Sequence, residues 1–313
     1  MVNDHGTHAK GENKMVLAGF TDEAAEDIQG QVRVLKELGW SSMEIRTVDG
    51  ISIHEIDEAK FDTVRRYLEE QGIGVCCLGS TIANWGHSLA GSFSETREMV
   101  ARTIKRMKLL KAPMVRIMSY KIELDADGRL KANQRETERF TRLREICSMF
   151  LDSGLTPVHE NCHTYGGMSF GHTLRLLDEI PGLKLVYDTG NPALTPDFTK
   201  DYPYPMQDAW EFYTHVRPHI VHVHIKDAIF DSAQRKEVYL YPGEGAGYVQ
   251  RTVADLLKTG YKGVFSIEPH MAVVFHDTSV KSNADLRYQN FLTYGRKFET
   301  LVNLVPGTNL TAN

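Results

Sequence analysis

The feature that most constrains the fold is an alternation of short apolar runs with longer amphipathic segments, repeated eight times. The apolar runs have strand length and many β-branched residues. They lie at 16–20, 42–46, 74–78, 114–118, 156–160, 183–188, 220–225 and 263–268, and helix-like segments include 24–38, 60–71, 95–111, 134–151 and 249–259. This alternation predicts a parallel sheet, and eight units favour a closed (β/α)8 TIM barrel over a doubly wound open sheet.

The eight units use almost the whole chain of 313 residues. No linker rich in Pro, Gly or Ser interrupts residues 15–305. We therefore expect a single barrel domain over 15–305, with a flexible N-terminal tail at 1–14 and a C-terminal tail at 306–313.

Composition excludes several classes of protein. An apolar content of 42% supports a large core, yet no stretch approaches the roughly 18 apolar residues of a membrane span. The polar start of the chain lacks a signal peptide's apolar segment, and four cysteines, two of them adjacent, do not form a disulfide framework. A net charge of −5 argues against a broad nucleic-acid surface. We expect a soluble, cytoplasmic enzyme or binding protein with no membrane or nucleic-acid partner.

Metal-binding side chains end the last four predicted strands. Glu160, Asp188, His224 and Glu268 each follow or end an apolar run. The carboxyl ends of barrel strands meet at one mouth, where active sites of such barrels lie. Three carboxylates and one imidazole suit Mn²⁺, Co²⁺, Mg²⁺ or Zn²⁺. The alternative is that each is an unrelated polar residue that ends a strand.

Several motifs in this order carry a family resemblance. They are Thr21-Asp22-Glu23, Leu38-Gly39-Trp40, Met43-Glu44-Ile45-Arg46, the His-x-Lys-Asp of 224–227, and Pro242-Gly243-Glu244-Gly245. Over roughly residues 15–300 the chain resembles the xylose isomerase-like TIM barrels, which include sugar phosphate isomerases and epimerases, tagatose 3-epimerase, hydroxypyruvate isomerase and inosose dehydratase. The resemblance implies a metal held by Glu160, Asp188, His224 and Glu268.

The resemblance also implies an activity, that of a metal-dependent isomerase or epimerase of a ketose or keto-sugar. Such an enzyme removes a proton beside a carbonyl through a metal-stabilised ene-diolate, and Glu160 and Glu268 inherit the acid/base roles. Mn²⁺ is the preferred metal, and no nucleotide cofactor is expected, because the glycines at 243, 245 and 247 do not fit a dinucleotide motif. The expected partners are the sugar substrate and either further copies of the chain or a small partner subunit.

A second reaction of the same family stays open. If a leaving group lies β to the carbanion, the enzyme is a lyase of 3-keto-glycosides, similar to the catalytic subunits of C-glycoside deglycosidases, with His163 as an additional acid or base.

Two further alternatives need to be weighed. The H-E-x-x-H motif of zinc proteases matches His159-Glu160-Asn161-Cys162-His163, but Pro157 and Gly166 place these residues in a strand and loop rather than a helix. A third alternative is a sugar-binding barrel or a scaffold subunit without activity.

Six further residues are candidates for binding substrate, and each has a structural alternative. Glu44, Arg46 and Arg116 contact sugar hydroxyls or form internal salt bridges, and His222 is a site residue or a core histidine. Lys226 stabilises an oxyanion or pairs with Asp227, and Trp85 stacks on a sugar or caps the barrel. These six candidates are Glu44, Arg46, Trp85, Arg116, His222 and Lys226. Relatives often carry His where this chain has Asn191, which leaves the contacts on that side open.

Overall fold

The computed structural model describes residues 15–273 and 282–308, so the expected tail at 1–14 and most of the one at 306–313 lie outside the described residues. Eight parallel strands form a nearly closed barrel in the order β1-β12-β9-β8-β7-β6-β5-β2. A single parallel bridge between Phe20 and Glu44 joins β1 to β2. The strands are β1 (Val16–Gly19), β2 (Ser42–Ile45), β5 (Gly74–Gly79), β6 (Met114–Ile117), β7 (Thr156–Glu160), β8 (Lys184–Asp188), β9 (Ile220–Ile225) and β12 (Val264–Ile267). The predicted TIM barrel is therefore confirmed, and every strand end lies within one residue of its expected position.

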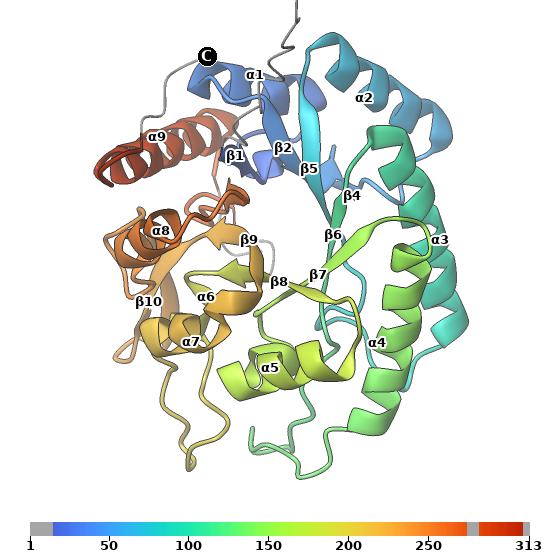
Figure 1. Ribbon diagram of the computed structural model, residues 1–313, viewed down its shortest axis with the longest axis vertical. Helices are drawn as coiled ribbons and strands as arrows, with labels where there is room; N and C mark the ends of the chain where they lie inside the picture. Colours follow the sequence, from blue (N-terminus) through green and yellow to red (C-terminus); the bar gives the residue numbers. More distant parts are fainter. Residues whose placement is uncertain (1–14, 274–281, 309–313) are drawn as a thin grey trace, which may run out of the picture.

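Helices surround the ring of strands in chain order (Figure 1). They are α1 (Ile28–Leu38), α2 (Glu58–Glu70), α3 (Phe93–Leu110), α4 (Glu136–Leu151), α5 (Phe170–Glu179), α6 (Asn191–Leu194), α7 (Ala209–Val216), α8 (Val249–Lys258) and α9 (Ala284–Asn303). The helix expected from residue 24 begins only at Ile28, because the Asp27 side chain accepts a hydrogen bond from Gly30 N and caps it there. It ends at Gly39, whose φ of 76° only glycine adopts readily.

Two hairpins stand outside the barrel sheet, and the sequence pattern did not predict them. Strands β3 (Thr47–Val48) and β4 (Ile51–Ser52) form a short antiparallel pair after β2. Strands β10 (Asp227–Asp231) and β11 (Lys236–Leu240) form a longer antiparallel pair directly after β9. Because both follow the carboxyl ends of barrel strands, they border the mouth where the metal-binding side chains were expected.

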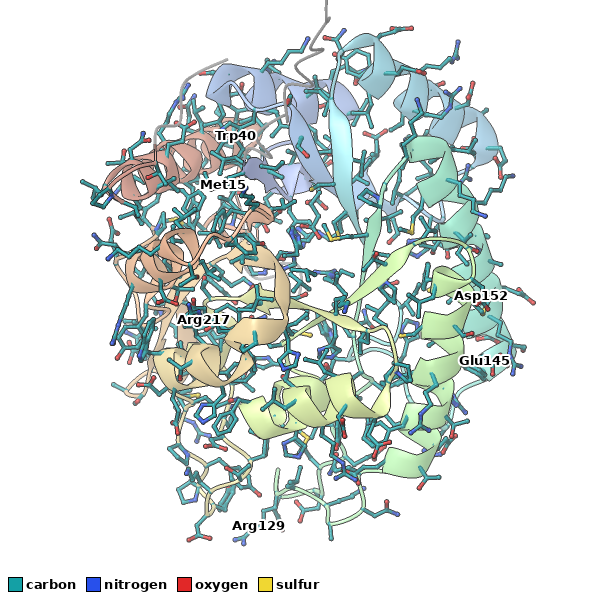
Figure 2. The ribbon with its side chains drawn as sticks, viewed as in Figure 1. Met15, Trp40, Arg129, Glu145, Asp152 and Arg217 are labelled. Atoms are coloured by element: carbon teal, nitrogen blue, oxygen red, sulfur yellow. The ribbon has the colours of Figure 1, made fainter. Side chains whose placement is uncertain are left out.

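Apolar side chains fill two regions. The larger cluster lies between the strands and the helices and includes Trp40. Figure 2 labels Trp40 between α1 and α9, and its Nε1 donates to Glu299 Oε1 at 2.9 Å. A smaller cluster fills the inside of the barrel with Ala18, Cys76, Cys77, Val158, Val186 and Val264. All four cysteines are buried and free, as expected. No helix within 15–273 or 282–308 is both long and apolar enough to cross a bilayer.

Candidate active site and metal centre

The strand register brings the four predicted metal ligands to one face of the sheet. Asp188 on β8 pairs directly with His224 on β9. Glu160 on β7 pairs with Val186, two residues before Asp188, and Glu268 follows two residues after the partner of His224 on β12. Residues that pair or differ by two along a strand point the same way. All four side chains therefore point into the barrel at its carboxyl end.

These four residues form a compact cluster. One ligand atom from each of Glu160, Asp188, His224 and Glu268 lies within 4.8 Å of the other three, and all four residues are buried. His224 Nδ1 makes no hydrogen bond to any described residue. A buried ring nitrogen without such a bond is unusual and calls for an explanation. The donor set and this nitrogen fit a divalent cation that favours oxygen ligands with one imidazole.

Three cations surround the cluster. Lys226 Nζ lies 2.9 Å from Asp188 Oδ2 and 2.8 Å from Glu268 Oε2. Arg116 Nη1 donates to Glu160 Oε2 at 3.0 Å, and Arg46 Nη1 donates to Glu268 Oε1 at 2.9 Å. Each cation thus contacts a carboxylate of the cluster, so the internal salt bridges considered for Arg46 and Arg116 are present. Lys226 pairs with these carboxylates rather than with Asp227.

Electrostatics keep two of the carboxylates ionised. Burial by itself would raise their pKa values, but Arg116 and His224 lower the pKa of Glu160 to about 2, and Lys226 holds that of Glu268 well below its usual range. Burial dominates at Asp188 and raises its pKa. Glu160 and Glu268 are consequently ionised at neutral pH.

A cavity of about 550 Å³ opens above the cluster. Its wall includes the predicted Arg46, Arg116 and Lys226, and at its rim lie Trp85, which is 41% exposed, and the exposed His163. His163 Nε2 lies 3.2 Å from the carbonyl oxygen of Leu194. The structure therefore brings five predicted groups, these three cations and two rings, to the space beside Glu160 and Glu268.

Glu44 and His222 do not reach this cavity. Both are fully buried, and His222 Nε2 donates to Glu44 Oε2 at 2.7 Å. Both side chains point into the closed interior of the barrel, and neither residue lines the cavity wall. The alternatives of an internal ion pair for Glu44 and a core histidine for His222 describe their positions.

The H-E-x-x-H motif has no protease geometry. His159 lies on β7 and its Nε2 is 2.9 Å from Ser119 Oγ, whereas Glu160, the next residue of the strand, points into the barrel. His163 belongs to the loop after β7. Since successive strand residues point to opposite faces, His159 cannot join a metal site that contains Glu160.

Sequence reasoning missed several residues of the site. Phe20 places its ring 4.3 Å from the guanidinium carbon of Arg46 and 5.0 Å from the His224 ring, beneath the cluster. Asn191 was named only as a departure from relatives and its contact was not predicted: it donates from Nδ2 to Glu160 Oε1 at 3.0 Å. Glu237 and Tyr239 of β11 line the cavity, and the run of Val238, Tyr239 and Leu240, which favours a strand, is the signal that could have revealed it.

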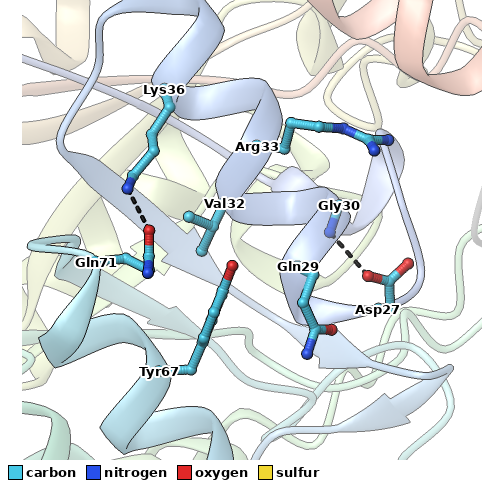
Figure 3. A pocket seen from close by; sticks show the side chains of 8 residues that line it. All are labelled: Asp27, Gln29, Gly30, Val32, Arg33, Lys36, Tyr67 and Gln71. Carbon is cyan, nitrogen blue, oxygen red and sulfur yellow. Dashed lines mark hydrogen bonds between the residues drawn. The ribbon is translucent and has the colours of Figure 1, made fainter.

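A second hollow lies outside the ring of strands, between α1 and α2 (Figure 3). It measures about 390 Å³, and side chains of these two helices form its walls. Lys36 contacts Gln71 across it, and Gly30 N donates to Asp27 at 2.8 Å. Because it lies between two outer helices, away from the strand ends, it is not a candidate active site.

The fold and the cluster define a class of protein: TIM barrels with a group of potential metal ligands at the carboxyl ends of barrel strands five to eight. The chain belongs to the xylose isomerase-like TIM barrel family, whose model matches residues 32–288. No curated protein sequence matches the chain.

Solved structures of similar fold carry several different names. A xylose isomerase-like TIM barrel protein from Mycobacterium smegmatis, solved in complex with magnesium, has a TM-score of 0.65 and 16% identity, over 92% of this chain and 98% of its own. The 3-keto-D-glucoside 4-epimerase of E. coli has a TM-score of 0.60 and 16% identity, over 91% and 100%. A probable 3-DHS dehydratase from Bacillus anthracis has a TM-score of 0.62 and 16% identity, over 88% and 97%. At this identity the likeness shows a common fold.

Proposed function

We propose that the protein is a divalent-metal-dependent isomerase or epimerase of a ketose or keto-sugar. The observation that carries the proposal is the buried cluster of Glu160, Asp188, His224 and Glu268 at the floor of a cavity. These four residues would hold the metal, with Mn²⁺ as the preferred ion and Mg²⁺, Co²⁺ or Zn²⁺ as others that suit the donor set. A bound divalent ion supplies a Lewis acid that makes a C–H bond beside a carbonyl more acidic.

The acid/base work falls to Glu160 and Glu268. Both are ionised at neutral pH because of the cations beside them, so either is able to accept a proton from a substrate carbon. The other glutamate then returns a proton to the opposite face, which gives an epimer. Return of the proton to the neighbouring carbon gives an aldose–ketose isomerisation. Asn191 holds Glu160 by a hydrogen bond of 3.0 Å and thereby limits its rotation.

The polar wall of the cavity supplies the remaining contacts. Lys226, between Asp188 and Glu268, is placed to stabilise negative charge that develops on a substrate oxygen. Arg46 and Arg116 offer N–H groups to sugar hydroxyls, and Trp85 at the rim offers an aromatic face. A small sugar is thus the expected substrate.

The location of His163 favours a second candidate, a lyase of 3-keto-glycosides. His163 lies at the rim of the same cavity, beyond Glu160, where it is able to protonate a leaving group. In this reaction Glu160 or Glu268 removes the proton beside the carbonyl, and the electron pair of that C–H bond expels the group at the β carbon. A solved structure with this fold is named as a 3-keto-D-glucoside 4-epimerase and another as a probable dehydratase.

Incubation in D2O with Mn²⁺ and a panel of ketoses and 3-keto-glucosides, followed by NMR, tests the proposal. We expect deuterium at a substrate carbon together with a new stereoisomer or positional isomer, and loss of turnover after chelation or in Glu160→Gln and Glu268→Gln. Glu299→Gln, which changes a carboxylate at the opposite end of the barrel beside Trp40, is the matched control and should keep full activity.

Each candidate has a contradicting result. Full activity after exhaustive metal removal contradicts the metal-dependent mechanism. A clean stereoisomer as sole product excludes the lyase, whereas an unsaturated or cleaved product that is lost in His163→Ala supports it. Absence of both deuterium uptake and product over the whole panel would favour a sugar-binding barrel.

A further inference from the structure

The Glu44 carboxylate contacts His224, one of the four potential metal ligands, from the interior of the barrel. Its Oε2 atom lies 3.1 Å from Nε2 of His224 and 2.7 Å from Nε2 of His222. Glu44, His222 and His224 have no exposed surface. An ionised carboxylate only accepts hydrogen bonds, so both imidazoles must present a protonated Nε2 to it.

This contact decides which nitrogen of His224 faces the cluster. With Nε2 bound to Glu44, Nδ1 is the remaining ring nitrogen, and it lies 3.7 Å from Glu160 Oε1. Nδ1 also makes no hydrogen bond within the described part of the chain. When the ring gives up a proton to bind a metal, the proton that remains is therefore the one on Nε2, and the Nδ1 lone pair faces Glu160 and the other cluster carboxylates.

The backbone holds Glu44 in this position. The ladder between β2 and β5 shifts register between Met43 and Glu44, which leaves Cys76 unpaired and sets Glu44 opposite Cys77. Such a bulge bends the strand and redirects a side chain. The parallel bridge from Glu44 to Phe20 ties the same residue to β1, whose Phe20 ring packs edge-on against His224 at 5.0 Å. Neighbours on two sides thus fix both partners of the hydrogen bond.

We propose that Glu44 is a positioning residue of the metal centre, which orients His224 and fixes its Nδ1 as the ligand atom. The inference rests on the metal site of the proposed function. Carboxylates that accept a hydrogen bond from a ligating histidine set its tautomer and raise its basicity, and their loss weakens metal binding about 10- to 100-fold. Glu44 is not a catalytic residue, since it does not reach the cavity.

Mn²⁺ titration by calorimetry on the full-length protein tests the inference, with wild type, Glu44→Gln and Cys147→Ala side by side. We expect Glu44→Gln to bind Mn²⁺ about 10- to 100-fold more weakly. Cys147→Ala removes a buried thiol from the apolar cluster between strands and helices, away from Glu44 and His224, and should bind as wild type does. Equal affinity for Glu44→Gln and wild type would overturn the positioning role while leaving the metal site intact. No binding by wild type would overturn the metal site itself, and this inference with it.

A measurement on the wild-type protein covers the case in which Glu44→Gln does not fold. In the Zn²⁺-loaded protein, the ¹⁵N shifts of the His224 ring report which nitrogen carries the proton. We expect a protonated Nε2 and a metal-bound Nδ1. The reverse pattern would contradict the inference, because a merely structural role for Glu44 does not fix the tautomer of His224.

Discussion

The loop between β11 and α8 is organised around one buried carboxylate, that of Asp227. Its Oδ2 accepts hydrogen bonds from the backbone N–H groups of Gly243 and Gly245 at 2.8 and 3.0 Å. Its Oδ1 accepts from Gly247 at 2.9 Å and from Ala228 at 3.1 Å. The loop needs glycine for this approach, since a Cβ at residue 245 would lie 2.4 Å from Oδ1. Asp227 therefore ties the β10–β11 hairpin and this loop to the end of β9.

We predict that Asp227→Asn destabilises the fold by about 3 kcal/mol. The amide keeps one acceptor oxygen but directs an NH2 group at two of the four N–H donors, so that two charge-assisted hydrogen bonds are lost. We count each at about 1.5 kcal/mol, the low end of the range, because the N–H groups of Gly243 and Gly245 are only partly buried. Urea unfolding at 25 °C followed by circular dichroism measures the change in the free energy of unfolding.

Asp231→Asn is the matched control for this measurement. Asp231 lies at the other end of β10 and also accepts two backbone hydrogen bonds, from Ala233 at 2.9 Å and Gln234 at 3.0 Å. Water replaces those bonds at the exposed turn, so we expect a loss below about 1 kcal/mol. If Asp227→Asn cost no more than Asp231→Asn, the assignment of the loop's stability to Asp227 would be wrong.

Two further predictions concern histidines. His54 is buried, neither ring nitrogen makes a hydrogen bond to a described residue, and burial lowers its pKa from 6.5 to about 4. As pH falls, His54 is therefore protonated in the unfolded chain before it is protonated in the folded one, and the wild type should lose about 2 kcal/mol of unfolding free energy between pH 7 and pH 5. His54→Leu should lose less stability over this range by that amount. Equal pH dependence of the two proteins in urea unfolding would contradict this. At His224, Glu44 and Glu160 raise the pKa to about 10 despite burial, so Mn²⁺ should displace one proton and its affinity should rise about tenfold per pH unit from pH 6 to pH 9. Calorimetry in buffers of different ionisation enthalpy counts the proton, and binding without proton release would refute the assignment.

The sequence alone determined the barrel and the residues of its cluster. Strand ends were predictable to one residue, because apolar runs and helical periodicity are local properties of the chain. Glu160, Asp188, His224 and Glu268 were identifiable for the same reason, since each lies at or next to the carboxyl end of a strand and all parallel strands end at one mouth. The hairpin of β10 and β11 was missed, because its two short strands pair only with each other and do not repeat the barrel pattern.

Only the tertiary structure decided the register that brings the cluster together. The ladder between β8 and β9 shifts between Leu185 and Val186 and skips Val221. Without that shift Asp188 would lie opposite Val223, whose side chain points away from the barrel interior, rather than opposite His224. Pairing between strands depends on contacts between residues far apart in the chain, which no local pattern encodes. Contacts of the same long-range kind place the Glu44 carboxylate against the His224 imidazole and away from the cavity in which a sugar would bind.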